Sequence, residues 1–311
     1  RCLDNRAAAA GSRPPCAAPP PARPPRPATP APALPGNDRL LFGLVLGLIT
    51  FWLFAQTMLN VSPDMQRDLG VAAGTMNVAV SLTSLFSGIF TVVMGGLADR
   101  LGRMRMVRLG LVLSIAGSLL VALAPAGVLA APVLLLGRAI QGLSAACIMP
   151  AGLALIKTWW SGAGRQRAIS MWSIGSWGAS GLCALFGGLV AAQFGWRAIF
   201  FASIAVALLG LWMLRGAPES RAEGRGNARF DLAGVLLFML TMLALEMLVT
   251  QGGKYGWLSD ATLGLAAATA VLGALFVRLE TRKGRHNFLG FTLFDNRPLS
   301  GPVLSHFLLN S

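Results

Sequence analysis

The stretch Gly95-Gly96-Leu97-Ala98-Asp99-Arg100-Leu101-Gly102-Arg103-Met104-Arg105 stands between two long apolar blocks and decides the fold. Its glycines permit a tight turn and a close approach between helices, because glycine has no side chain to hinder either. Asp99 follows the first block and is surrounded by arginines, so it can form a charge-assisted pair or face the N-terminus of a neighbouring helix. The plain alternative is a solvated basic loop that only sets topology.

The composition around this stretch is that of a membrane protein. Of the 311 residues, 55% are hydrophobic and only 12% are charged, and the mean hydropathy is +0.64. Because soluble domains carry about 25% charged residues, these values exclude an ordinary soluble globule, a disordered chain and a coiled coil. A transmembrane helix needs about 20 apolar residues. Apolar blocks of roughly this length lie near residues 40–61, 75–98, 107–124, 131–156, 168–193, 198–214, 231–251 and 261–279, and a ninth begins near 299.

Basic residues gather in every second gap between these blocks. Lysine and arginine number 26 against 12 acidic residues, which gives a net charge of +14. The N-terminal tail, the gaps 99–108, 157–167 and 215–229, and the stretch after residue 279 are basic, whereas the gaps between them are not. Because basic loops stay in the cytoplasm, we expect a multi-pass protein of the bacterial inner membrane with a cytoplasmic N-terminus. The spread of charge over short loops argues against nucleic-acid binding.

The spacing Gly-x3-Asp-Arg-x-Gly-x-x-Arg of the opening stretch resembles the signature loop of the major facilitator superfamily of transporters. A second match, Arg-x-x-Gln-Gly, begins at Arg138 inside an apolar block. Such an arginine should face a polar interior, although near a helix end it can also extend toward the interface. The resemblance implies that Arg138 lines the central cavity and takes part in proton coupling. It also implies a conformational-switch role for the loop residues Gly95, Asp99, Arg100, Gly102, Arg103 and Arg105.

The fifth apolar block matches the family only in part. The family's antiporters carry a Gly-Pro pair before a double glycine at this place. This chain has the double glycine at Gly187-Gly188, but Cys183-Ala184 stands where the Gly-Pro pair would be. We expect Gly178, Gly187 and Gly188 to allow tight helix packing. The departure at Cys183-Ala184 weakens the antiporter interpretation without removing it.

The end of the first block resembles the EmrB/QacA-type pattern Leu-Asp-x-Thr-x-x-Asn-Val, in which the acid is a proton or cation site. Here Ala55 takes the place of the acid, while Thr57 and Asn60 match. Gln56 and Asn60 are four residues apart and therefore share a helix face. They either offer hydrogen bonds to a substrate or hold helices together. The predicted cavity residues are Gln56, Asn60, Gln141, Trp172 and Trp177, of which the tryptophans would stack on flat or cationic drugs.

The resemblance runs from about residue 40 to the end of the chain. Family members of this type have fourteen helices, arranged as two six-helix bundles with two inserted helices between them. We therefore interpret the chain as C-terminally truncated and lacking the second bundle that transport needs. The expected parts are a Pro/Ala-rich disordered tail (1–39), a six-helix bundle (40–215), a cytoplasmic linker (216–230), the two inserted helices (231–280), and a loop with the start of the second bundle (281–311).

Glu246 is the one acidic residue clearly inside an apolar block. It lies about 22 Å along a helix that crosses about 30 Å of hydrocarbon, near the outer interface. It is either a partly hydrated side chain at a helix end or a proton carrier. Because helices 1, 2, 4 and 5 hold no carboxylate away from the loops, coupling through this half needs Glu246 or a carboxylate in the missing half.

These features together predict a secondary active transporter that exports drugs or other small amphipathic compounds. Alternating access would be driven by the proton gradient, with no cofactor. Because the acid of the first helix is absent, transport of an anionic or neutral metabolite is an alternative, and an inactive half-transporter is another. The partners are a small-molecule substrate and the lipid bilayer. An enzyme is not expected, since no nucleotide-binding glycine loop, metal cluster or nucleophile constellation is present.

Overall fold

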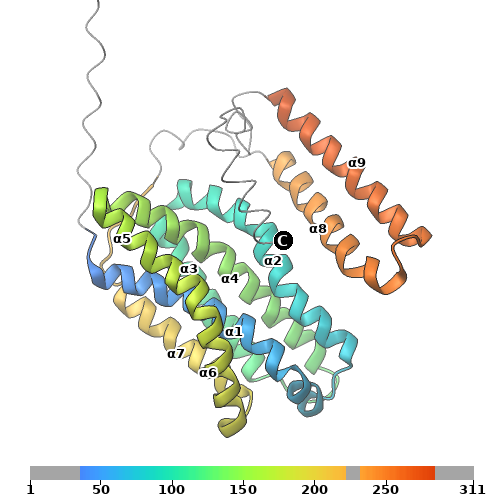
Figure 1. Ribbon diagram of the computed structural model, residues 1–311, viewed down its shortest axis with the longest axis horizontal. Helices are drawn as coiled ribbons and strands as arrows, with labels where there is room; N and C mark the ends of the chain where they lie inside the picture. The colour runs from blue at the N-terminus through green and yellow to red at the C-terminus, as the bar shows by residue number, and fades with distance from the viewer. Residues whose placement is uncertain (1–35, 222–231, 284–311) are drawn as a thin grey trace, which may run out of the picture. The chain divides into compact units, whose positions relative to one another are not determined.

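A computed structural model describes residues 36–221 and 232–283, and every regular element within these ranges is helical (Figure 1). This confirms the all-α prediction. The elements are α1 (Asp38–Leu69), α2 (Ala73–Leu101), α3 (Arg103–Ala122), α4 (Ala130–Trp159), α5 (Gly162–Ser173), the π-helical turn η1 (Ile174–Gly178), α6 (Ala179–Phe194), α7 (Arg197–Met213), α8 (Leu232–Tyr255) and α9 (Asp260–Lys283).

The helices have the length and composition of membrane spans. Six of the described helices are long and apolar enough to cross a bilayer, with α5, η1 and α6 forming one continuous span. Helix α7 and the 233–249 part of α8 are apolar but shorter. Helix α1 runs eight residues past its predicted end, because backbone hydrogen bonds continue through a polar stretch until Gly70 adopts a left-handed conformation (φ 66°) and ends the helix. Hydropathy alone cannot detect such an extension.

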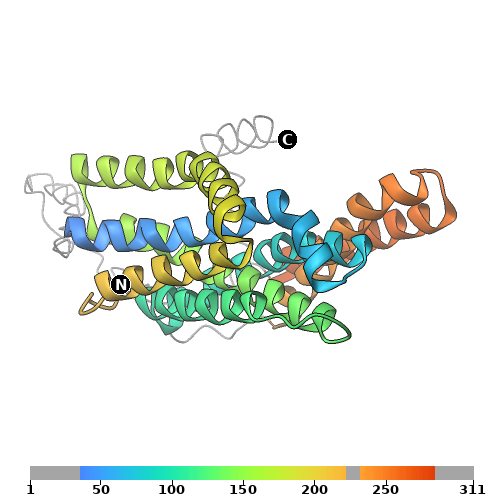
Figure 2. The same ribbon diagram turned by 90° about the horizontal axis from the view of Figure 1, so that it is seen from below.

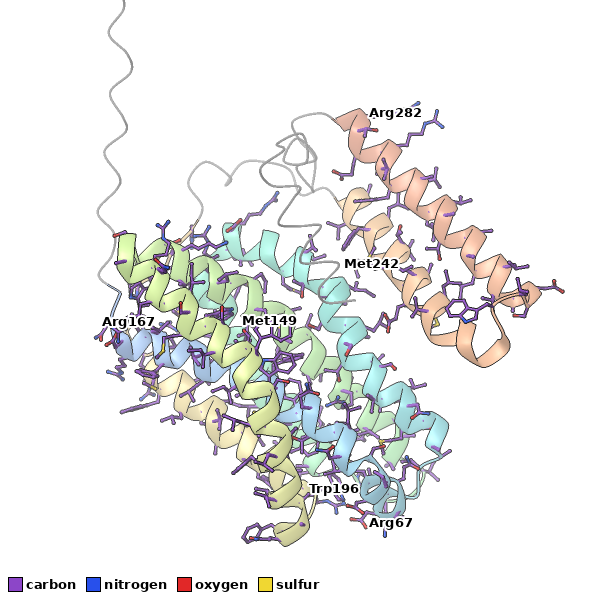
Figure 3. The ribbon with its side chains drawn as sticks, in the orientation of Figure 1. Arg67, Met149, Arg167, Trp196, Met242 and Arg282 are labelled. Atoms are coloured by element: carbon purple, nitrogen blue, oxygen red, sulfur yellow. The ribbon has the colours of Figure 1, made fainter. Side chains whose placement is uncertain are left out.

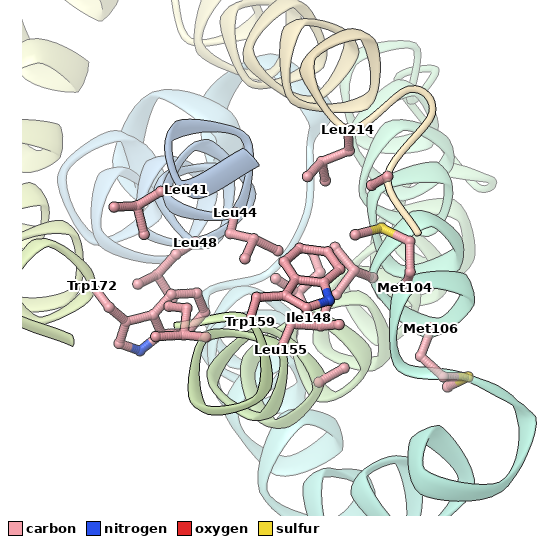
Figure 4. Close-up of a cluster of buried hydrophobic side chains, with 14 of the residues drawn as sticks. Leu41, Leu44, Leu48, Met104, Met106, Ile148, Leu155, Trp159, Trp172 and Leu214 are labelled. Carbon is pink, nitrogen blue, oxygen red and sulfur yellow. The ribbon is translucent and has the colours of Figure 1, made fainter. Parts of the chain in front are cut away.

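Two hydrophobic clusters fill the interior of the bundle formed by α1 to α7. The first contains Leu44, Ile148 and Trp159 and lies at the end of the bundle that carries the α2–α3 loop (Figure 4). We call this the basic end. The second cluster contains Met58 and Phe200 and lies toward the opposite end. Between adjacent helices the packing is close, since a side chain at Gly142 of α4 would meet the Thr83 carbonyl of α2 at 2.5 Å.

The fifth span, formed by α5, η1 and α6, contains a single π-helical turn, η1. The chain changes direction between α5 and α6, and η1 lies at this bend (Figure 2). One-turn π segments commonly interrupt helices at functional sites. Cys183-Ala184, which stands in place of the family's Gly-Pro pair, lies within the regular helix α6. The irregular part of this span is therefore η1. Gly175 within η1 allows the approach of α1, because a side chain there would lie 2.7 Å from Cγ1 of Val45.

Helices α8 and α9 form an antiparallel hairpin. Ser259 caps α9, since its hydroxyl accepts a hydrogen bond from the backbone N–H of Thr262 at 3.3 Å. Phe238 and Phe276 pack across the hairpin with ring centroids 5.7 Å apart. The predicted tail 1–39 (apart from its last four residues), most of the linker 216–230 and the ninth block lie outside the described residues, so the predicted part boundaries stay predictions.

Candidate functional site

The predicted switch loop joins three helices at the basic end. Asp99, in the last turn of α2, accepts two hydrogen bonds from the Arg103 guanidinium, from Nη2 at 2.8 Å and from Nε at 3.0 Å. The same guanidinium donates from Nη1 to Thr158 Oγ1 of α4 at 2.6 Å. The Asp99 and Arg103 side chains are only 21% and 16% exposed, so water competes weakly for this pair. The loop therefore holds the ends of α2, α3 and α4 together.

Glu219 is a functional candidate that the sequence did not reveal. Its two carboxylate oxygens accept hydrogen bonds from the backbone N–H groups of Met104 at 2.9 Å and Arg105 at 3.1 Å, in the first turn of α3. The Ser220 carbonyl accepts the N–H of Arg103 at 2.9 Å. Gly102 makes room for this contact, since a side chain there would lie 2.5 Å from Cδ of Glu219. Over 110 residues separate the partners, so no local pattern signals the contact.

The remaining loop residues are placed less tightly. Gly95 faces Pro150 of α4 at an ordinary van der Waals distance, 3.4 Å from a built Cβ. Arg100 is half-buried. Arg105 is exposed and lies 3.7 Å from Glu219 through Nε, a distance typical of a weak surface ion pair. Gly102 has φ 125°, a backbone conformation that favours glycine, and it separates α2 from α3.

Arg138 is completely enclosed within the bundle at 1% exposure. Its Nη1 donates to the carbonyl oxygen of Phe54 in α1 at 3.2 Å and to Gln141 Oε1 at 2.8 Å. Its Nε donates to the Ala79 carbonyl of α2 at 3.2 Å. Gln141 in turn donates to Ser118 of α3 at 3.1 Å. Arg138 and Gln141 thus form one polar network that links four helices.

The hydrogen-bond partners of Arg138 are all neutral groups. Within residues 36–221 and 232–283, no ion pair is found for this guanidinium. A buried arginine is stabilised when its donors are satisfied by carbonyl dipoles, even without a carboxylate. The other predicted coupling residue, Glu246, lies in α8 with a half-buried side chain. The structure therefore places the two predicted coupling residues in separate elements and not in one hydrogen-bonded pair.

Three polar residues of α1 form a seam with α6. Gln56 Nε2 donates to Ser180 Oγ at 2.7 Å, and Asn60 Nδ2 donates to the Ala184 carbonyl at 3.3 Å. Thr57 Oγ1 donates to the carbonyl of Cys183 at 3.4 Å. Gln56 is half-buried and Asn60 is exposed. These contacts favour the helix-joining interpretation of the polar face of α1, while the exposed part of Asn60 can still meet a substrate.

The predicted packing glycines of the fifth span differ in their surroundings. Gly187 lies directly against α1, since a Cβ added to it would overlap Oγ1 and Cγ2 of Thr57 and approach its Cβ to 2.8 Å. Nothing lies within 4 Å of a Cβ built on Gly188, and Gly178 meets only Ile174 of its own turn at 3.7 Å. Gly187 alone of the three is needed for close packing.

The predicted tryptophans have opposite environments. Trp172 is buried in the first hydrophobic cluster, where its ring packs on Gly152 of α4. Trp177 is 64% exposed on η1. The five predicted cavity residues therefore do not meet at one place: Gln56 and Asn60 lie on the α1–α6 seam, Gln141 belongs to the Arg138 network, and only Trp177 presents an open ring.

An apolar pocket of about 430 Å³ opens beside the seam between α1 and α6. Its wall is almost free of polar atoms, so it suits a flat or aliphatic apolar group. The sequence did not indicate this pocket, because its residues are ordinary apolar ones from two distant segments. They are Ile49, Leu53, Ala179, Leu182, Cys183, Leu185, Phe186 and Leu189.

A second group of residues, joined by hydrogen bonds and a cation–π contact, lies at the end of the bundle opposite the basic end. Trp196 and Arg67 lie at this end and Arg167 at the other (Figure 3). Trp196 is 3% exposed and donates from Nε1 to Asp68 at 2.8 Å. Arg197 stacks on the Trp196 ring at 4.3 Å and donates to the Ala122 carbonyl at 3.1 Å. These contacts join α1, α3 and α7 at the end of the bundle opposite the basic end.

Comparison with known proteins agrees with this architecture. Residues 40–294 match the family model of the Major Facilitator Superfamily. The chain is 46% identical over 275 residues to the "Quinolone resistance protein NorB" of Staphylococcus aureus strains MRSA252 and MSSA476, and the match covers 88% of this chain. It spans only 58% of the length of these relatives.

Solved structures show the same fold. A crystal structure of the peptide transporter POT in complex with sulfate superposes with a TM-score of 0.54 at 16% sequence identity. The superposition covers 74% of this chain and 50% of that transporter. At this identity the likeness concerns the fold alone. The family match covers most of the chain, and the helices have the length and composition of membrane spans. The chain therefore belongs to the Major Facilitator Superfamily, a family of membrane transporters and not of enzymes.

Proposed function

We propose that the protein is a proton-driven exporter of drugs or similar small amphipathic compounds, of the EmrB/QacA type. The 46% identity to quinolone resistance proteins carries this proposal. The apolar pocket between α1 and α6 supports it, since a flat aromatic drug can pack against an apolar wall. The protein would cycle between inward-open and outward-open states and use the proton gradient as its only energy source.

The orientation follows from the basic loops. We propose that the basic end lies in the cytoplasm, together with the N-terminus, in the inner membrane of a bacterium. Asp99 and Arg103 would then clasp the cytoplasmic side while the outside is open. Two inserted helices, α8 and α9, would follow the first bundle, and a second bundle would complete the transporter.

Drug susceptibility tests this proposal directly. The gene that encodes this chain, expressed from its own start codon to its own stop codon, should raise the resistance of a pump-deficient bacterial strain to quinolones. A protonophore should remove the difference in drug accumulation, because dissipating the proton gradient stops a proton-driven pump. A strain whose susceptibility to quinolones and cationic dyes stays unchanged would contradict drug export.

Transport of an anionic or neutral metabolite is the second candidate. Ala55 stands where an acid would attract cations, and Arg138 brings a positive charge into the bundle without an ion pair among the described residues. In that case the gene should leave drug susceptibility unchanged but alter the metabolites that cells release. If neither changes, both transport candidates are contradicted, and an inactive half-transporter is the alternative that is left.

The role of Glu246 in proton coupling is tested by removing its charge. The variant Glu246→Gln keeps the size of the side chain but cannot bind and release a proton, so it should abolish pH-driven drug efflux. Glu246→Asp keeps a titratable carboxylate and should retain part of the activity. Unchanged efflux by Glu246→Gln would assign the coupling carboxylate to another part of the transporter.

A further inference from the structure

We propose that Glu219 is a positioning residue for the switch loop, because its carboxylate holds the first turn of α3 in place. The inference uses the proposed transport cycle only for its functional consequence. The contact itself is independent of substrate. A helix begins with backbone N–H groups that have no partner within the helix. In α3 no acidic residue lies in the first turn and no local side chain caps it, so these groups must find partners elsewhere.

The partners come from the segment 214–220, which follows α7. Ser220 supplies its carbonyl to the N–H of Arg103, and Glu219 supplies one carboxylate oxygen each to Met104 and Arg105. The first three N–H groups of α3 are therefore satisfied. A carboxylate is the strongest acceptor available at this place, because its negative charge also faces the positive end of the helix dipole.

A second tie fixes the same segment. Nη2 of Arg108, about one turn further along α3, donates to the carbonyl oxygens of Leu214 at 3.1 Å and Ala217 at 3.2 Å. These carbonyls lie at and just beyond the C-terminal end of α7, where a cation is favoured. Segment 214–220 is thus attached to α3 at two points, one through the Glu219 carboxylate and one through the Arg108 guanidinium.

Arg103 transmits this attachment to the switch loop. Its backbone N–H is bound by Ser220, while its guanidinium binds Asp99 of α2 and Thr158 of α4. If the first turn of α3 becomes mobile, the backbone of Arg103 is no longer fixed. Its guanidinium then no longer stays within hydrogen-bond distance of Asp99 and Thr158. The Asp99–Arg103 pair therefore depends on Glu219, although Glu219 touches neither Asp99 nor Thr158 in the described contacts.

Gly102 is part of the same contact between segment 214–220 and α3. With φ 125° it turns the chain from α2 into α3, and its missing side chain leaves the space that the Glu219 carboxylate fills. A methyl group there would lie 2.5 Å from Cδ of Glu219 and would displace the carboxylate. The glycine that the sequence places in the switch motif thus makes room for a residue of segment 214–220, which follows α7.

The consequence concerns the Asp99–Arg103 pair. Because segment 214–220 holds the first turn of α3 through Glu219, a displacement of this segment acts on the pair through Arg103. A cap that only added stability would leave the transport rate unchanged in a protein that is still folded, and this difference separates the two roles.

Hydrogen exchange on the purified full-length protein tests the contact. Glu219→Ala should speed exchange of the amides at residues 103–105 by about tenfold, the size expected for loss of a helix cap. Glu219→Gln should give a smaller increase, since its amide oxygen still accepts one bond but carries no charge. Asp64→Ala is the matched control, because this carboxylate pairs with Arg67 in the last turns of α1, at the other end of the bundle. It should leave residues 103–105 unchanged.

Two further measurements make the test decisive. Gly102→Ala should reproduce the exchange pattern of Glu219→Ala, and the double variant should add less than the sum, because both changes remove one contact. In cells, Glu219→Gln should lower maximal efflux rate severalfold with little change in apparent drug affinity. Unchanged exchange at residues 103–105 in Glu219→Ala would overturn the contact, and faster exchange with an unchanged efflux rate would overturn the positioning role. Absence of efflux in the unmodified protein would count against the proposed function and leave the exchange comparison intact.

Discussion

Replacing Gly187 with alanine is expected to remove most of the folded protein from the membrane, while Gly188→Ala is expected to be tolerated. The two glycines are neighbours in one helix, yet only Gly187 faces Thr57 of α1. A methyl group at Gly187 overlaps the Thr57 side chain, which is buried, β-branched and hydrogen-bonded to α6, so it has no free rotamer to adopt. Overpacking of this kind destabilises proteins by about 1–3 kcal/mol, and more where the backbone must move.

The yield of detergent-extracted protein and its thermal unfolding midpoint measure this effect. Gly187→Ala should fall well below the unmodified protein in both, and Gly188→Ala should match it. Adding Thr57→Ala to Gly187→Ala should recover part of the loss, because it removes the two atoms that overlap. A Gly187→Ala protein as stable as the unmodified one would show that α1 and α6 are further apart than described here.

Replacing Arg138 with methionine is expected to leave the protein folded and to reduce drug efflux at least about tenfold, which corresponds to about 1.4 kcal/mol. Arg138 has no ion pair among the described residues, so its replacement by methionine leaves no buried charge without a partner. The carbonyls of Phe54 and Ala79 lie inside α1 and α2, where backbone hydrogen bonds within each helix also use them, so neither is orphaned. The Gln141 amide oxygen does lose its bond to Arg138, at a cost of about 1–3 kcal/mol. The positive charge that the family resemblance links to proton coupling is lost.

Arg138→Lys serves as the control for charge. Lysine keeps the charge but lacks the planar fork that reaches two carbonyls and Gln141 together. It should retain more efflux than methionine if charge is what matters, and as little as methionine if the fork that joins the helices is what matters. Normal efflux by Arg138→Met would assign Arg138 a purely structural role.

The sequence predicted the fold well because hydropathy is a local property. Each apolar block corresponds to a described helix up to the hairpin, and the family motifs identified the architecture that the comparisons support. The ends of helices were less predictable. Helix α1 extends through polar residues to Leu69, because hydrogen bonds outside an apolar block continue until a glycine ends the helix.

The candidate site was predicted only in its local parts. Asp99 and Arg103 are only four residues apart, and arginines surround Asp99 in the sequence, so a charge-assisted pair could be expected there even though Gly102 interrupts the helix between them. Gly187 was expected to allow close packing, but its neighbour Thr57 lies in another helix and no spacing rule identifies it. Glu219 was not identified from the sequence for the same reason, because its partners Met104 and Arg105 lie over 110 residues away.

Buried polar residues were the hardest to interpret. Arg138 in an apolar block predicted a polar surrounding, and the structure supplies one made of carbonyl groups and an amide, whose positions depend on how four helices pack. The hydrogen bond from Trp196 to Asp68 also joins residues far apart in the sequence, so it could not be predicted without the path of α1.

Uptake of a fluorescent quinolone by inside-out membrane vesicles that carry the complete gene product tests the central claim most directly. When a pH gradient is imposed with the vesicle interior acidic, proton-driven export predicts accumulation of the drug inside the vesicles. It should collapse when the gradient is dissipated and be absent from vesicles without the protein. Equal accumulation with and without the protein, or accumulation that ignores the gradient, would contradict the account.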